Sequence, residues 1–159
     1  MQMAEHFSFQ QSWADLGSGA GFPGIVVALL NNSPTTPLSH LIESDRRKAA
    51  FLTEAARVTE AKVLVHPDRV ERILPQLKVP LTAVLSRAVA PLDKLLLWSG
   101  HHIEAGATGL FLKGRKTRHE LNAVLGPERF VFEFLPSKTS TTGEIVRVKS
   151  RGHSKLTNP

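Results

Sequence analysis

The sequence of 159 residues contains no cysteine. This absence excludes thiolate zinc sites, iron–sulfur chemistry and any mechanism that uses a cysteine nucleophile. It also fits a reducing compartment. Residues 1–11 lack the basic segment and following apolar run of a signal peptide, and the apolar runs are far shorter than a membrane span. We therefore expect a cytoplasmic protein that does not associate with a membrane.

Tyrosine is absent as well, and the aromatic residues are eight Phe and two Trp. Such a chain lacks the aromatic row on which proteins read single-stranded nucleic acid. Trp13 and Trp98 are interpreted as core or rim packing. The neighbouring His101 and His102 are the nearest approach to a metal-binding pair, and we expect no metal site.

Acidic residues are the minority among the charged ones, which leaves a formal net charge of +6 and a pI of about 10.1. A strongly basic balance favours a polyanionic partner, of which nucleic acid is the usual one. Basic residues gather in one segment that contains no acid, and these are the candidate RNA contacts: Lys113, Arg115, Lys116 and Arg118.

Residues 15–24 read Asp-Leu-Gly-Ser-Gly-Ala-Gly-Phe-Pro-Gly and carry the strongest functional signal. They follow a strand-like run and precede an apolar run that can continue as a helix. Glycine allows positive φ and lets a ligand approach the backbone closely. A strand, a glycine turn and a helix N-terminus together predict a nucleotide-type site at the first βα turn of a doubly wound fold.

The glycines fit two patterns, a dinucleotide fingerprint and the acidic loop of class I S-adenosylmethionine (SAM) methyltransferases. A pyrophosphate requires free N–H donors, whereas Asp15 adds a carboxylate and Pro23 removes a donor. SAM carries an ammonium and a sulfonium, which favour a nearby acid. Glu43 ends the next strand, where a carboxylate can bind ribose hydroxyls of either cofactor. SAM is the favoured ligand, and an NAD(P)-binding oxidoreductase domain is an alternative.

Strand and helix signals alternate along the chain, which predicts a mainly parallel sheet with helices on both faces. Strands are expected at 13–16, 40–42, 62–65, 82–85 and 108–112, followed by an antiparallel pair at 130–135 and 144–149. Helices are expected at 22–30, 45–59, 70–74, 91–101 and 117–125. Residues 1–151 are predicted to form one domain, and 152–159 a disordered tail.

Four segments together resemble one family of bacterial methyltransferases. They are the glycine loop, Leu-Ile-Glu-Ser-Asp-Arg-Arg-Lys-Ala-Ala-Phe-Leu at 41–52, Ser-Arg-Ala-Val-Ala-Pro-Leu at 86–92 and Leu-Lys-Gly at 112–114. The chain is similar to the GidB (RsmG) family, whose members methylate N7 of a guanine in 16S ribosomal RNA. The resemblance implies a class I SAM-dependent methyltransferase fold, with a seven-stranded sheet that has an antiparallel edge strand. It also implies SAM as cofactor and 16S rRNA or a small-subunit precursor as partner.

The resemblance also implies roles for individual residues. Gly17 and Phe22 would line the methionine and ribose side of SAM, Val70 and Glu71 would lie beside adenine, and Arg87 would close the site. The full expected cofactor set is Asp15, Gly17, Ser18, Gly19, Gly21, Phe22, Glu43, Arg69, Val70, Glu71 and Arg87. Arg87 would also contact RNA, and Lys113 would end the fifth strand beside the substrate groove.

Methylation at N7 requires no general base, because the N7 lone pair carries no proton, and we therefore assign no catalytic acid–base residue. The segment Ser86-Arg87-Ala88-Val89 lacks the Asn/Asp-Pro-Pro-aromatic motif of exocyclic amino methyltransferases. Family members carry a longer helical N-terminal region than the 11 residues that precede the first strand here. A non-catalytic RNA-binding remnant is thus a further alternative. We expect a monomer.

Overall fold

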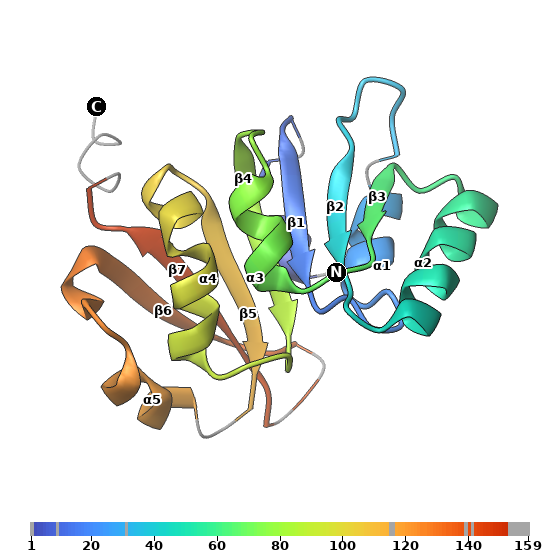
Figure 1. Ribbon diagram of the computed structural model, residues 1–159. Helices are drawn as coiled ribbons and strands as arrows, with labels where there is room; N and C mark the ends of the chain where they lie inside the picture. The colour runs from blue at the N-terminus through green and yellow to red at the C-terminus, as the bar shows by residue number, and fades with distance from the viewer. Residues whose placement is uncertain are drawn as a thin grey trace.

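The computed structural model describes residues 2–8, 10–30, 32–114, 117–138, 140 and 142–152, with the side chain of Arg118 excepted. Its centre is a seven-stranded sheet in the order β3-β2-β1-β4-β5-β7-β6 (Figure 1). The strands are β1 (Ser12–Leu16), β2 (Ser39–Ile42), β3 (Val63–His66), β4 (Leu81–Arg87), β5 (Thr108–Lys113), β6 (Phe130–Pro136) and β7 (Glu144–Ser150).

The first five strands pair in parallel, and β7 pairs antiparallel with both β5 and β6. The strand order reverses between β1 and β4, which makes their carboxyl ends the switch point where doubly wound sheets bind ligands. The expected class I methyltransferase sheet is confirmed. Its antiparallel strand is β7, which lies inside the sheet, while β6 forms the edge.

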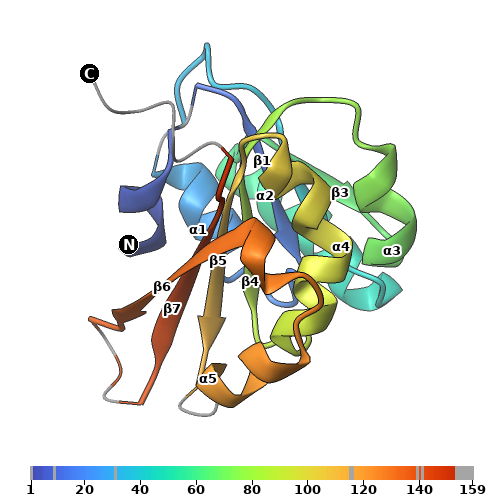
Figure 2. The ribbon, with the colours of Figure 1, turned by 90° about the vertical axis from the view of Figure 1, so that its left-hand side faces the viewer.

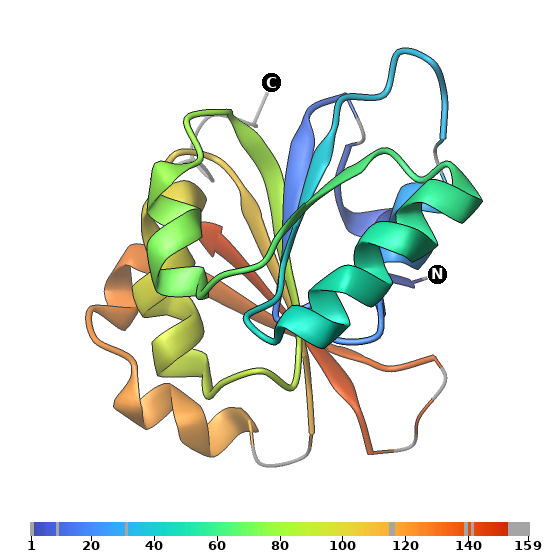
Figure 3. The same cartoon turned by 45° about the vertical axis from the view of Figure 1, so that its right-hand side comes forward.

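Helices cover both faces of the sheet, as predicted. The regular ones are α1 (Gly24–Leu29), α2 (Arg46–Thr59), α3 (Val70–Ile73), α4 (Leu92–Glu104) and α5 (Thr117–Glu120). α1 and α2 lie on one face, and α3 and α4 lie on the other (Figures 2 and 3). Leu41 and Ile42 are adjacent on β2 yet belong to different hydrophobic clusters, because successive strand residues point to opposite faces.

A local sequence signal explains the start of α2, and two other helices differ from their expected bounds. Asp45 caps α2, and its Oδ1 accepts hydrogen bonds from the main-chain N–H groups of Arg47 at 2.8 Å and Lys48 at 3.2 Å. α1 begins at Gly24, after Pro23, and not at residue 22 as expected. The helix expected at 117–125 is shorter and divided into α5 and a 3₁₀ turn, Leu121–Ala123. Residues 153–159 of the expected tail lie outside the described residues.

The N-terminal segment forms a 3₁₀ helix, η1 (Gln2–His6), and packs on the face that carries α1 and α2. Its Met3 side chain is 1% exposed and joins the same hydrophobic cluster as Trp13 and Ile145. The beginning of the chain is thereby held beside β7, which is formed by residues near the other end. Within the described part of the chain, no helix is both long and apolar enough to cross a membrane.

Candidate cofactor and substrate site

The glycine loop leaves the carboxyl end of β1 in a left-handed path. Gly17, Gly19 and Gly21 have φ values of 65°, 55° and 86°. The main-chain N–H groups of Gly17 and Ser18 both donate to the carbonyl oxygen of Ile42, at 2.9 and 3.1 Å. These bonds fix the loop to the end of β2, which places it at the switch point of the sheet.

The glycines differ in what surrounds them. A Cβ on Gly17 would lie 2.2 Å from Val89 Cγ2, and one on Gly24 would lie 2.4 Å from Leu41 Cδ2, so these two positions allow close packing. A Cβ on Gly19 would have only the Gly17 carbonyl oxygen within 4 Å, at 3.8 Å. Gly19 therefore borders open space, and it is the position in this loop where a ligand can approach the backbone.

Asp15 is fully buried beneath the loop. Its Oδ2 accepts a hydrogen bond from the Gly24 main-chain N–H at 3.0 Å, while its Oδ1 has no hydrogen-bond partner among the residues that the structure describes. Burial raises the pKa of the Asp15 carboxyl to about 7. The sequence interpretation gave Asp15 a direct contact with the cofactor. In this structure its carboxylate instead joins β1 to the start of α1, because the loop lies between it and the cavity.

Glu43 follows β2 and is 7% exposed. Its Oε2 accepts from the Gly19 N–H at 2.9 Å, and its Oε1 accepts from the Asp45 N–H at 2.8 Å. A carboxylate oxygen has two lone pairs, so each oxygen retains acceptor capacity. Glu43 thus orients the glycine loop and still presents acceptors toward the adjacent cavity.

A cavity of about 370 Å³ lies between the glycine loop and the ends of β2, β3 and β4. It is lined by seven of the residues expected to bind cofactor: Gly17, Gly19, Glu43, Arg69, Val70, Glu71 and Arg87. Sequence reasoning missed its other lining residues, Ile42, Ser44, Lys48, Ala88, Val89 and Trp98. Trp98 comes from α4, far along the chain, and no local signal marked it.

The remaining expected cofactor residues do not line this cavity. Ser18 is 1% exposed and its hydroxyl donates to the Asp15 carbonyl oxygen at 3.0 Å. Gly21 packs against Ile25 in the first turn of α1. Phe22 is 53% exposed and lines a neighbouring groove of about 490 Å³. Ser18 and Gly21 therefore shape the loop, and Phe22 differs from expectation because it lines the neighbouring groove beside Arg87 and not the cofactor cavity.

Arg87 stands at the carboxyl end of β4, where the three hollows of this edge meet. It lines the cofactor cavity, the groove beside Phe22 and a third cavity of about 530 Å³. Its guanidinium carbon lies 5.9 Å from the centroid of the Phe22 ring. Ala88, which follows, has a φ of 53°, a left-handed conformation that is uncommon for a residue with a side chain. The chain thus turns sharply and leaves the Arg87 side chain exposed.

Lys113 has other partners than the expected RNA. Its side chain is 8% exposed, and its Nζ lies 2.8 Å from both Glu120 Oε2 and the Ala90 carbonyl oxygen. The same Glu120 oxygen accepts from the Leu92 N–H at 2.7 Å. This network fastens the loop after β4 to α5. These partners within the fold argue against the expected direct contact of Lys113 with RNA, although Lys113 also lines the cavity of about 530 Å³ that adjoins Arg87.

The other candidate RNA contacts cannot be placed. Arg115 and Lys116 lie outside the described residues, and so does the side chain of Arg118, although its backbone belongs to α5. In the described part of the chain, no group of three or more His, Cys, Asp or Glu side chains is arranged to hold a metal ion.

The family model of GidB, described as rRNA small subunit methyltransferase G, matches residues 1–141. Proteins named ribosomal RNA small subunit methyltransferase G are similar to the chain. The one from Methylobacterium sp. (strain 4-46) is 38% identical over 94% of this chain and 71% of its own length. The one from Paramagnetospirillum magneticum is 44% identical over 88% of this chain and 66% of its own length. The chain thus spans about two thirds to three quarters of the length of such relatives.

Solved structures share the fold at low sequence identity. An rRNA methylase from Streptococcus thermophilus superposes with a TM-score of 0.68 at 11% identity, covering 93% of this chain and 91% of that one. TrmK from M. capricolum, solved with S-adenosylhomocysteine (SAH), superposes with a TM-score of 0.66 at 8% identity. The match covers 94% of this chain and 66% of the TrmK chain. The match to the family model over most of the sequence decides the relationship: the chain belongs to the GidB family of rRNA small subunit methyltransferase G.

Proposed function

We propose that this protein transfers the methyl group of SAM to N7 of a guanine in 16S ribosomal RNA. The observation that carries the proposal is the cavity at the switch point, bordered by Gly19, Glu43 and Arg87, in a chain of this family. Ligands of open α/β sheets bind at this place. The family description supplies the RNA class, and the choice of N7 extends the resemblance of the motifs.

The residues around the cavity fit SAM. The open space at Gly19 allows the cofactor to approach the backbone, and Glu43 has acceptor capacity for ribose hydroxyls. Val70 is buried at the base of the cavity and offers an apolar surface for adenine. The buried Asp15 keeps the loop in place from behind and adds negative charge beneath the site when it is ionised.

The chemistry requires orientation more than proton transfer. SAM supplies an electrophilic methyl group on a cationic sulfur. The guanine N7 lone pair lies in the plane of the ring and carries no proton, so no side chain has to remove one. The protein contributes mainly by holding both reactants in line. Glu43 fixes the cofactor side, and Arg87, which borders both hollows, is suited to orient phosphate or the guanine edge through its planar guanidinium.

A methyl-transfer assay tests the proposal. The purified chain is incubated with isotope-labelled SAM and small-subunit RNA or 30S particles that lack the modification, and the nucleosides are identified by mass spectrometry. We expect label in 7-methylguanosine. Binding of RNA without transfer would favour the non-catalytic alternative. Binding of NAD but not SAH, compared side by side by calorimetry, would favour the oxidoreductase alternative.

Arg87→Lys provides the sharper variant. Lysine retains the charge but not the planar fork that makes two parallel hydrogen bonds. Because Arg87 is exposed, we expect the variant to fold normally and to bind SAH normally. Its kcat/KM for RNA should fall at least about tenfold, or roughly 1.4 kcal/mol of transition-state stabilisation. Turnover close to that of the unmodified protein would remove Arg87 from the reaction site.

A further inference from the structure

The groove beside the cofactor cavity is formed by segments far apart in the sequence. Its volume is about 490 Å³, within the range of pockets that bind small ligands. Among its apolar lining residues, Phe22 of the glycine loop is exposed and Leu112 of β5 is half-buried, while Pro23, Met3 of η1 and Ile145 of β7 are buried. Arg87 lines both this groove and the cofactor cavity, so the two hollows are neighbours.

Phe22 is unusual among the aromatic residues of this region. Trp13 is 2% exposed and Phe111 is fully buried, whereas the Phe22 side chain is 53% exposed at the mouth of the groove. The Arg87 guanidinium lies over its ring, 5.9 Å from the centroid. Exposed aromatic rings and guanidinium planes are the two groups on which RNA-binding proteins stack unpaired bases.

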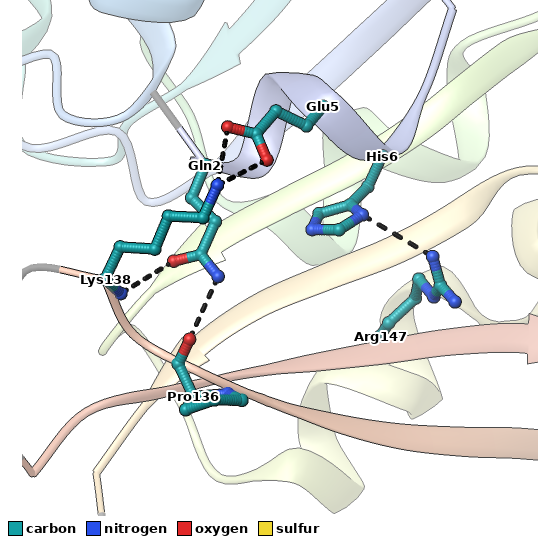
Figure 4. A network of polar contacts seen from close by, with 6 residues as sticks. All are labelled: Gln2, Glu5, His6, Pro136, Lys138 and Arg147. Atoms are coloured by element: carbon teal, nitrogen blue, oxygen red, sulfur yellow. Dashed lines mark hydrogen bonds and ion pairs between the residues drawn. The ribbon is translucent and has the colours of Figure 1, made fainter.

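η1 also lines the groove, and a polar network fixes its position (Figure 4). Gln2 Nε2 donates to the Pro136 carbonyl oxygen at 2.9 Å, and Gln2 Oε1 accepts from the Lys138 N–H at 3.0 Å. Glu5 pairs with Lys138 Nζ at 2.8 Å. Together with the buried Met3, these contacts hold η1 against the end of β6, so the groove has two walls of defined position.

We propose that this groove receives the target purine of the RNA and that the base stacks on Phe22. This inference rests on the proposed function and names the residue that positions the substrate. A base is the favoured occupant because the groove combines an exposed aromatic face, a guanidinium and apolar walls on a basic protein, and because it adjoins the cofactor cavity. One aromatic residue suits a single base taken out of the stack, which is how enzymes reach base atoms.

Phe22→Ala and Phe22→Trp test the stacking, with Phe51→Ala as a matched control. Phe51 is 55% exposed, close to the value for Phe22, but lies on α2, and it does not line the groove. We expect Phe22→Ala to lower kcat/KM for RNA at least about tenfold, since the base would lose its stacking partner. Phe22→Trp should retain most activity, Phe51→Ala should retain all of it, and SAH affinity should be unchanged in all three.

A second measurement does not depend on turnover. GMP is titrated into the SAH-saturated protein and followed by NMR. We expect saturable shifts for the unmodified protein and Phe51→Ala, and none for Phe22→Ala, with folding checked by thermal unfolding. The inference is overturned if GMP does not bind the unmodified protein, if Phe22→Ala binds GMP normally, or if Phe22→Ala loses SAH affinity as well. Phe22-dependent GMP binding without any methyl transfer would contradict the proposed function alone.

Discussion

The two sides of the sheet's carboxyl edge are constructed differently. On the β1–β2 side, Gly19 and Glu43 lie 24 positions apart in the sequence, and the Gly19 main-chain N–H donates a hydrogen bond to the Glu43 carboxylate. On the β4–β5–β7 side, the groove brings together Met3, Phe22, Arg87 and Ile145, which are spread over almost the whole sequence. The first side, which we call the cofactor side, is built mainly from a short sequence motif. The second, which we call the substrate side, is built by tertiary packing.

Two charged residues show the same difference. Glu43 and Lys113 each adjoin the end of a parallel strand, and both were expected to face a ligand. The Glu43 carboxylate accepts hydrogen bonds only from main-chain N–H groups in the described part of the chain and retains acceptor capacity. The Lys113 ammonium is taken up by Glu120 and the Ala90 carbonyl oxygen. Among the described residues, the strand-end charge that keeps hydrogen-bonding capacity toward a cavity is therefore the one without an ion-pair partner.

The largest expected effect concerns Asp15, which underlies the cofactor side. Its pKa is about 7 in the folded protein and near 3.8 when exposed. Between these pH values the unfolded chain ionises while the folded one remains protonated, so stability falls as pH rises. The shift in pKa corresponds to a decrease in the free energy of unfolding on the order of 4 kcal/mol, which is complete above about pH 7. Burial is the main cause of the raised pKa. The polar neighbours Ser18 and Gly24 and then the Arg87 charge lower the pKa, and Glu43 raises it further.

Asp15→Asn isolates this titration, because the amide is neutral and can still accept from the Gly24 N–H. We expect the difference in unfolding free energy between the two proteins to change across pH 4–7 in the stated direction, as measured by urea denaturation. The contributions of other titrating groups, such as His40, to the pH dependence are the same in both proteins and cancel when the two unfolding free energies are subtracted. A difference that does not vary with pH would mean that Asp15 is ionised throughout and that the cofactor side is less tightly packed than it is here.

Gly19→Val tests whether the cofactor side depends on access to the backbone. The valine side chain would extend into the open space at the cavity, and we expect SAH affinity to fall at least about 100-fold, or roughly 2.7 kcal/mol. Gly126→Val is the matched control, since Gly126 has a similar φ of 63° but does not line this cavity. Calorimetry should show normal SAH binding by the control. Equal affinities in the two variants would rule out the ligand position assigned to Gly19.

Glu43→Ala addresses the one side chain that serves both loop and ligand. We expect it to weaken SAH binding by about 1.5–3 kcal/mol, the range for hydrogen bonds to a charged group. Glu43→Gln retains one acceptor oxygen and should therefore lose less SAH affinity than Glu43→Ala. Glu54→Ala is the control, because Glu54 is an exposed carboxylate on α2 that does not line the cavity. If Glu43→Ala lowers the melting temperature and leaves SAH affinity unchanged, Glu43 only supports the loop.

The same contrast explains what the sequence could predict. The alternation of strands and helices, the helices on both faces and the cavity-lining residues Gly17, Gly19 and Glu43 were predictable, because periodicity and a short motif encode them. The arrangement of the sheet was expected from the family resemblance and not from periodicity. The direction of the Phe22 ring and the positions of Gln2 and Glu5 beside the groove could not be predicted from the sequence. They depend on contacts with residues more than 60 positions away, such as Arg87 for Phe22 and Lys138 for Gln2 and Glu5. The burial of Asp15 beneath the glycine loop could not be predicted either, because the motif indicates only that an acidic residue precedes the glycines.

The smallest expected effect belongs to Lys113 on the substrate side. Lys113→Ala should lower stability by about 1 kcal/mol, because Glu120 loses its partner but is partly exposed and can be solvated. The dependence of RNA binding on salt should stay the same, since no phosphate contact is removed. Arg115→Ala is the comparison: as a predicted phosphate contact, it should reduce the salt slope by roughly 0.7–0.9. If Lys113→Ala reduced the slope equally, Lys113 would have to leave Glu120 when RNA binds. The substrate side would then be reorganised by its ligand, whereas the cofactor side is already formed.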